Sequence, residues 1–211
     1  MSSRMDRFLL LSGAIASAIF IVFPVLGIGF FFPGYSHVLD SISRQGAPDS
    51  PVSLATNLSF FLVGAFVILF GLGLYRVFGK GRFGRIGTAI VLIAGISGIL
   101  VGAFPTDPPG AVHSAGYAWH VFSATLAGVL GFVAVSMFWV REYRRGANRA
   151  WIVAVPLLLA PSALFGLLFI TGNPWVLPIY GLSERISLGL LMALVFSVSL
   201  SLYRTLPVNG S

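Results

Sequence analysis

The chain has 211 residues, of which 57% are hydrophobic and only 9% are charged, with a formal net charge of +7 and a mean hydropathy of +0.95. Soluble globular domains carry about 25% charged residues, so this composition excludes a water-soluble domain and predicts a protein surrounded by lipid. The absence of cysteine excludes disulfide bonds, thiolate chemistry and cysteine-ligated metal sites.

Six apolar segments have about the 20-residue length that crosses a bilayer as a helix. Because lipid offers no partners to free backbone groups, each segment is expected to be an α-helix, and the long apolar runs lack the alternation of barrel strands. We therefore predict an all-α fold, with a single six-helix transmembrane domain over residues 1–211. The expected spans are Phe8–Phe32, Leu54–Tyr75, Ile86–Phe104, Gly116–Val140, Ala150–Ile170 and Leu182–Tyr203.

The orientation of these spans follows from Lys and Arg, which are enriched in cytoplasmic loops. If the N-terminus is cytoplasmic, 11 of the 13 Lys and Arg lie inside, and only Arg44 and Arg185 lie outside. The first span is too long for a signal peptide and no small-residue cleavage site follows it, so we expect it to be retained. The pattern predicts a multi-pass cell-membrane protein with both termini in the cytoplasm, and the cations indicate topology rather than nucleic-acid binding.

The loop Tyr35–Pro51, which follows the first span, is the most polar piece of the chain. We expect its sequence "SISRQG" to be a structured re-entrant or capping element folded into the helix bundle, with Gly46 permitting a tight turn. Arg44 is expected to turn inward and to meet Glu184 or Asp107.

The second, third and fourth spans carry residues that concern packing. Asn57 lies one turn into the second span and needs a hydrogen-bond partner. Small residues in the next two spans have spacings that let helix backbones approach closely in lipid, so we expect them to serve packing. These residues are Gly95, Gly98 and Gly102 in the third span and Gly116, Ala124, Gly128 and Gly131 in the fourth.

The third loop and the helix after it hold Asp107, His113 and His120. Pro108 disfavours helical geometry at Asp107, whose carboxylate either caps a turn or belongs to a site. His120 follows His113 by seven residues, on the same helix face and about 10 Å deeper. That spacing does not suit two histidines that bind one metal from the same helix, because such ligands are usually four residues apart. An ionisable group inside a bilayer nevertheless indicates function, because its burial is unfavourable.

The sixth span opens with Glu184 and Arg185, adjacent residues whose side chains do not face each other on a helix. Each needs a partner elsewhere, although Glu184 also suits the positive end of the helix dipole. Buried polar groups in lipid pair with one another, which predicts one cluster at the outer face of the bundle. The expected members are Ser43, Arg44, Asn57, Asp107, His113 and Glu184.

The chain resembles the prokaryotic integral-membrane family called domain of unknown function 998 over nearly its whole length. The residues that carry this resemblance are Ser43, Gly46, Pro51, Asn57, Phe104, Pro105, Asp107, His113, Gly116, Glu184 and Arg185. The chain is also distantly similar to the Frag1/DRAM/Sfk1 membrane proteins, through Ile42, Ser43 and Gly46 and then His113 and Gly116. Some of those proteins are linked to lipid-anchor remodelling and phosphoinositide handling, so the resemblance implies lipid without naming a reaction.

Two functions follow from these residues. The first is a non-catalytic protein that binds or organises lipid headgroups, in which two arginines contact phosphate and their neighbours hold them in place. Its ligand-binding candidates are Asp40, Ser43, Arg44, Asn57, His113, Glu184 and Arg185. The alternative is a membrane-embedded lipid hydrolase or transferase acting at the outer leaflet, with or without a metal. Its catalytic candidates are His113 or His120 as the base, Asp107 or Asp40 to orient that base, and Ser43 or Ser41 as the nucleophile or the partner of a metal-bound water.

Several properties stay open at this stage. Haem held by His113 or His120 would need His37, in a loop, as its second ligand, and the sequence identifies no cofactor or metal. Membrane lipid is the expected partner and nucleic acid is not. The oligomeric state and the ligand are not determined by the sequence.

Overall fold

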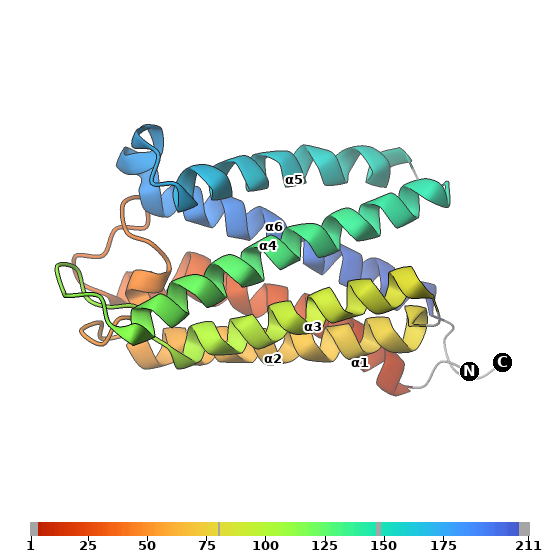
Figure 1. Ribbon diagram of the computed structural model, residues 1–211, viewed down its shortest axis with the longest axis horizontal. Helices are drawn as coiled ribbons and strands as arrows, with labels where there is room; N and C mark the ends of the chain where they lie inside the picture. The colour runs from red at the N-terminus through yellow and green to blue at the C-terminus, as the bar shows by residue number, and fades with distance from the viewer. Residues whose placement is uncertain (1–3, 80, 147–148, 207–211) are drawn as a thin grey trace.

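The computed structural model describes residues 4–79, 81–146 and 149–206, and within these ranges the fold is all-α, without a strand, as the sequence predicts (Figure 1). Six long helices and four short ones form there. The long helices are α1 (Arg4–Phe20), α2 (Ser53–Phe78), α3 (Arg82–Ala103), α4 (Ala115–Arg144), α5 (Arg149–Ile170) and α6 (Tyr180–Thr205). The short helices are η1 (Ile21–Gly27), η2 (Ile28–Phe31), η3 (Ser43–Gly46) and η4 (Pro174–Ile179).

The six long helices are long and apolar enough to cross a membrane, which confirms the predicted spans. The first span continues from α1 through η1 and η2, and the sixth includes η4 before α6. Successive helices run in opposite directions, so segments 32–52, 104–114 and 171–173 gather at one end of the bundle, which we call the loop end (Figure 1). The opposite end carries Arg76, Arg82 and Arg149, and we call it the basic end.

Glycines bring α2 and α3 together, as expected from the third span. A Cβ atom added to Gly64 would lie 2.6 Å from the carbonyl oxygen of Gly95 and 2.8 Å from the carbonyl carbon of Gly98. A Cβ atom at Gly102 would lie 2.5 Å from the carbonyl oxygen of Asn57. Side chains at these positions would force the two helices apart, so the glycines permit the close packing of α2 on α3.

The small residues of α4 have a different role from the predicted one. A Cβ atom added to Gly128 would meet nothing within 4 Å, and one at Gly116 would meet only the Ser114 hydroxyl. Gly128, Gly131 and Ala124 instead line a cavity at the centre of the bundle. Helix α4 packs on α3 but contacts α5 and α6 sparsely, so Gly128 leaves space open, whereas a Cβ atom added to Gly131 would lie 3.0 Å from the Leu191 side chain of α6.

The first span changes helix type before it reaches the loop end. Helix η1 is a π-helix that contains Pro24, which cannot donate a backbone hydrogen bond. Pro24 and Val25 lie in its last turn, where carbonyl groups lose their partners within the helix. Wider turns of this kind frequently occur at functional sites. Here they present carbonyl groups to side chains from elsewhere in the chain, which the sequence analysis did not anticipate.

Candidate functional site

The segment "SISRQG" is folded into the bundle, as predicted. Its Ile42 is 1% exposed and packs in a core cluster with Phe20, Phe60 and Val101, from three different helices. The next four residues form the short helix η3, in which Gln45 is fully buried. An apolar anchor at Ile42 and a buried amide at Gln45 therefore hold a polar loop against the ends of the membrane helices.

Gln45 and Tyr35 connect this loop to the π-helix. The side-chain amide of Gln45 donates to the Pro24 carbonyl at 2.9 Å and to the Tyr35 hydroxyl at 2.8 Å. Tyr35 in turn donates to the Ser41 carbonyl at 2.8 Å. Burial raises the pKa of Tyr35, against the lowering effect of the nearby Arg185, so the hydroxyl keeps the proton that it donates. Sequence reasoning missed both residues, although Gln45 is a neutral polar residue in a loop that was expected to fold inward.

Arg185 is the arginine that turns inward. Its guanidinium donates to the carbonyl groups of Val25 at 3.3 Å, Asp40 at 2.9 Å and Gly181 at 2.9 Å. It also donates to the Tyr35 hydroxyl. These bonds join α6 to the π-helix and to the loop. Asp40 thus contacts Arg185 through its backbone, while its carboxylate accepts from the Ser36 amide at 2.7 Å.

Arg44 points elsewhere, and the expectation that it meets Glu184 or Asp107 is wrong. Its two terminal nitrogens each lie 2.7 Å from an oxygen of Asp49, in a bidentate pair. The guanidinium also lies 4.9 Å from the centre of the Phe32 ring. The Arg44 hydrogen bond holds the pKa of the Asp49 carboxyl below its usual range. A carboxylate five residues away in the same loop satisfies Arg44, so nothing draws it into the bundle.

Asn57 and Gly46 form a contact of their own. The Asn57 amide donates to the Gly46 carbonyl at 2.9 Å. A Cβ atom added to Gly46 would lie 2.5 Å from the side-chain oxygen of Asn57. Gly46 is absent from the described glycines with positive φ, so its role differs from the predicted one. A side chain at Gly46 would displace the Asn57 amide from its hydrogen bond, and the turn does not require left-handed backbone.

Asp107 and His113 lie at the start of α4. Asp107 accepts from the Ser114 amide at 2.7 Å and from the Ser114 hydroxyl at 2.8 Å, and Ser114 caps the helix through the Tyr117 amide. The backbone bond from Ser114 lowers the pKa of the Asp107 carboxyl. His113 lies 3.9 Å from Asp107, stacks on Tyr117 and has a side chain that is 69% exposed. This pair serves the helix terminus at the surface, so the predicted single cluster does not form around it.

Glu184 and His120 are buried instead. Glu184 is 8% exposed, and one of its oxygens, Oε2, accepts from the Ile42 amide at 2.5 Å. The ring nitrogen Nδ1 of His120 lies 2.7 Å from the Phe104 carbonyl. Over the part of the chain that the structure describes, no three His, Asp or Glu side chains are grouped so as to hold a metal ion.

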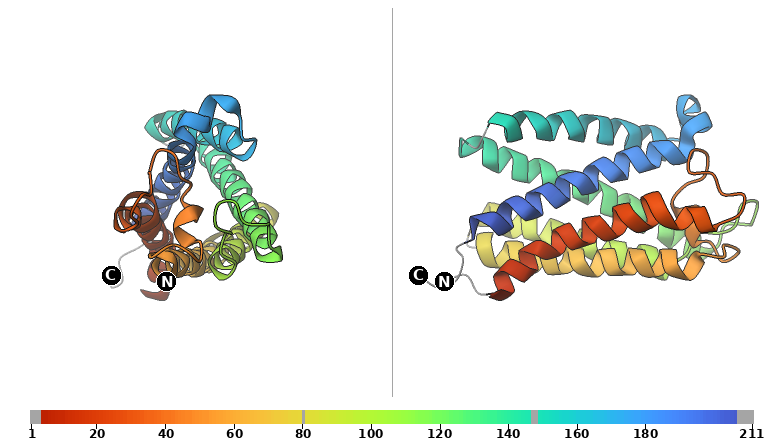
Figure 2. Two further views of the ribbon diagram at one scale, coloured as in Figure 1. Left: turned by 90° about the vertical axis from the view of Figure 1, so that its left-hand side faces the viewer. Right: turned by 180° about the vertical axis from the view of Figure 1, so that it is seen from behind.

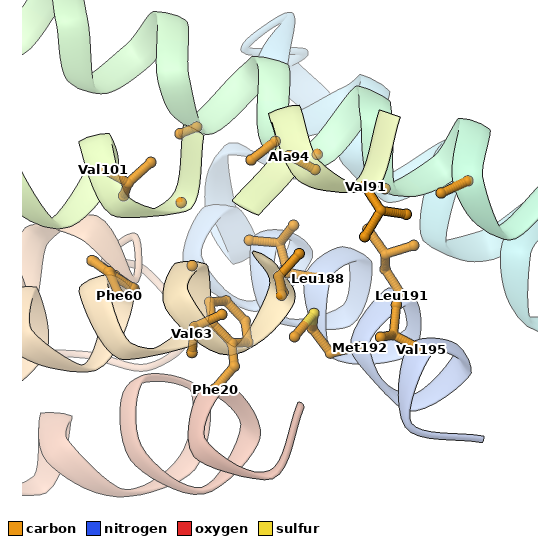
Figure 3. Close-up of a pocket in the computed structure, with 18 of the residues that line it drawn as sticks. Phe20, Phe60, Val63, Val91, Ala94, Val101, Leu188, Leu191, Met192 and Val195 are labelled. Atoms are coloured by element: carbon orange, nitrogen blue, oxygen red, sulfur yellow. The ribbon is translucent and has the colours of Figure 1, made fainter. Parts of the chain in front are cut away.

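A cavity of about 210 Å³ connects these groups to the middle of the bundle. Its walls come from α1, α2, α3, α4 and α6, and Figure 3 shows apolar side chains such as Phe60, Val101 and Leu188 around one shared space. Seen from the loop end in Figure 2, the helices surround this centre. An engineered apolar cavity of about 150 Å³ in another protein stays dry and binds benzene, so a space of this size accommodates a hydrocarbon.

The polar groups of the cavity are confined to one end. Of the described residues that line it, three are polar or ionisable: Ser43, His120 and Glu184. All three lie near the loop end, whereas the remaining lining residues are apolar or glycine. On α6 the lining extends from Glu184 to Val198, which is about 21 Å at 1.5 Å per residue. The cavity is therefore a long apolar space with one polar end, at Ser43, His120 and Glu184.

Comparison with known proteins gives one finding. A family model described as "Protein of unknown function (DUF998)" matches residues 14–201. No curated protein and no solved structure matches the chain. The more distant likeness to the Frag1/DRAM/Sfk1 proteins stays a prediction.

Proposed function

The chain belongs to the family described as protein of unknown function (DUF998), and from this premise we propose that this integral membrane protein binds a single lipid. The acyl chain occupies the central cavity, and the headgroup lies beside Ser43, His120 and Glu184 at the loop end. We further propose that the protein resides in the cell membrane with its loop end facing outward, because only two of the described Lys and Arg, Arg44 and Arg185, lie at that end.

The observation that carries this proposal is that the cavity is apolar along its length and polar only at one end. A hydrocarbon chain gains about 25 cal/mol for each Å² of apolar surface that leaves water, but it gains little by leaving lipid. Binding from a bilayer therefore requires shape and a fixed polar end, and this cavity offers both. Its lining extends about 21 Å along α6, while one leaflet of a hydrocarbon core is about 15 Å thick. A single acyl chain fits that length.

The structure also suggests how the space is maintained. Helix α4 presents Gly128, Gly131 and Ala124 to the cavity, although larger side chains would stabilise the apo protein by filling it. The headgroup of the lipid would be positioned by side chains that hydrogen bonds already hold in place. His120 is held by the Phe104 carbonyl, and Glu184 by the Ile42 amide. The geometry of the polar end is thus set before a ligand arrives.

One observation favours the second candidate function, a lipid hydrolase or transferase. Ser43 and His120, two of its predicted catalytic residues, line the same cavity beside Glu184. Asp107 and His113 do not support it, because Asp107 is bonded to Ser114 and His113 is exposed. In this function, His120 would act as the base and Ser43 as the nucleophile. Release of a fatty acid or transfer product would distinguish it from binding alone.

Filling the cavity tests the proposed binding. A Cβ atom added to Gly128 meets nothing within 4 Å, so Gly128→Leu should place its side chain in the cavity without displacing backbone. We expect the lipid recovered with the purified variant, measured by mass spectrometry, to fall at least tenfold, which corresponds to about 1.4 kcal/mol.

Gly189→Leu is the matched control for this experiment. Gly189 lies on α6, also has nothing within 4 Å of an added Cβ atom, and does not line the cavity. Lipid content should be unchanged in this variant. Equal lipid recovery from both variants, at similar thermal stability, would show that the cavity does not hold the lipid.

A further inference from the structure

We infer that the headgroup bound at the polar end of the cavity is a hydrogen-bond donor, a hydroxyl or an amine on a single-chain lipid, and that Glu184 receives it. This inference rests on the proposed function and specifies the class of lipid. It departs from the sequence-based expectation that arginines at this end bind a phosphate.

The first argument is the incomplete pairing of Glu184. This side chain is 8% exposed and lines the cavity, and its Oε2 atom accepts from the Ile42 amide. No hydrogen bond from the described residues reaches the other oxygen, Oε1, and no Lys, Arg or His nitrogen among them lies within 4.0 Å of either oxygen. A buried carboxylate is unfavourable unless its oxygens are paired. A donor on the ligand would complete the pairing.

The second argument is that both neighbouring arginines are already engaged. Arg185 uses its guanidinium to hold the carbonyl groups of Val25, Asp40 and Gly181, together with Tyr35. Arg44 forms a bidentate pair with Asp49. Neither arginine lines the cavity, and no Lys or Arg occurs among the described residues that do. A phosphate in the cavity would therefore lie beside a carboxylate with no cation in the cavity lining to bind it, and like charges at short range repel.

The third argument comes from His120. A carbonyl oxygen can only accept, so Nδ1 of His120 carries the hydrogen that joins it to Phe104. In the neutral imidazole, Nε2 is then an acceptor. The polar end thus offers a carboxylate and an imidazole as acceptors, and one hydroxyl, Ser43, that can act either way. These acceptor groups match a ligand whose headgroup donates hydrogen bonds.

Three chain-matched probes test the inference: hexadecylamine, hexadecanol and hexadecyl phosphate. Each would be titrated calorimetrically into the full-length protein in the same detergent micelles, with a protein-free titration subtracted. We expect the amine and the alcohol to bind at least tenfold more tightly than the phosphate. This comparison uses the unmodified protein, so it does not depend on whether a variant folds. Phosphate binding that equals or exceeds that of the other two would overturn the inference while leaving lipid binding intact.

Substitution then assigns the effect to Glu184. Glu184→Gln keeps an oxygen for the Ile42 amide but removes the charge, so the advantage of the amine over the phosphate should fall about tenfold. Glu142→Gln in the otherwise wild-type protein is the control, because Glu142 pairs with Arg141 at the basic end and should not affect the preference. An unchanged preference in Glu184→Gln would exclude Glu184 as the recognising group. If no probe binds and Gly128→Leu retains as much native lipid as the wild type, the proposed function itself fails.

Discussion

At the scale of single residues, the two arginines of the loop end differ in direction: Arg185 turns into the bundle, whereas Arg44, which was predicted to turn inward, does not. Arg185 was considered a phosphate ligand, yet it joins three segments of the chain through backbone carbonyl groups. Arg44 was expected to be the inward residue, yet it pairs within its own loop. The last turn of η1 presents carbonyl groups to both partners: Arg185 from α6 donates to Val25, and Gln45 from the loop donates to Pro24, while Arg44 finds its carboxylate at Asp49. We therefore expect Arg185 to contribute mainly to the stability of the fold and not to ligand binding.

Alanine substitution compares the two arginines directly. Arg185→Ala removes the donors that satisfy several buried carbonyl groups, each of which costs about 1–3 kcal/mol when left unpaired. We expect a loss of about 3 kcal/mol in the free energy of unfolding, measured by thermal unfolding in detergent. Arg44→Ala should have a much smaller effect, because exposed ion pairs contribute little. Arg82→Ala at the exposed start of α3 is the control, and equal melting temperatures for Arg185→Ala and Arg82→Ala would contradict the assigned role.

At the scale of helices, the two glycine-rich helices differ in what their small residues do. Glycines of α3 allow contact with α2, whereas the small residues of α4 line the cavity. The spacing of glycines is similar in both, so the pattern alone predicts packing for each. The position of α4, which packs extensively on α3 but only sparsely on α6, separates a packing face from a cavity wall.

An alanine at Gly64, the glycine of α2 that faces the α3 glycines, and an alanine at Gly128 of α4 should show this difference. Gly64→Ala would place a methyl group 2.6 Å from the Gly95 carbonyl oxygen, so we expect a destabilisation of about 1–3 kcal/mol. Gly128→Ala adds its methyl group to open space and should be neutral, or stabilising by up to about 1 kcal/mol through helix propensity. Thermal unfolding of both purified variants measures the effect. A destabilised Gly128→Ala would mean that α4 packs more tightly than described.

At the scale of the whole molecule, the alternation of six helices places the loop end and the basic end on opposite sides of a membrane. The distribution of cations predicts which end faces the cytoplasm, because Lys and Arg are enriched in cytoplasmic loops. A ligand at the polar end of the cavity would accordingly be taken from the outer leaflet. This orientation follows from charge and is independent of what the cavity binds.

Cysteine labelling tests the orientation, since the chain has no cysteine of its own. Val112, which is 94% exposed at the loop end, and Gly81, exposed at the basic end, are suitable positions. Gly81 has φ −110° and no atom within 4 Å of an added Cβ, so Gly81→Cys is tolerated. An impermeant maleimide added to intact cells should label Val112→Cys and leave Gly81→Cys unlabelled. Labelling of Gly81→Cys but not of Val112→Cys would show that the basic end, not the loop end, faces outward.

The sequence by itself determined the all-α class, the six spans and the inward folding of the loop before α2, since hydrophobic length and local polarity are properties of short segments. It also identified Ser43, His120 and Glu184 as candidates, because polar residues in apolar surroundings are visible in any sequence. Only the tertiary structure decided that these three share a cavity while Asp107 bonds the helix-capping Ser114 and His113 stays exposed, and that Arg185 turns inward in place of Arg44. These outcomes depend on pairs such as Ile42 with Glu184 and Val25 with Arg185, which are 142 and 160 residues apart in the chain. No local pattern encodes such a distance, because the partner of a buried polar group is set by which helix ends meet when the bundle packs.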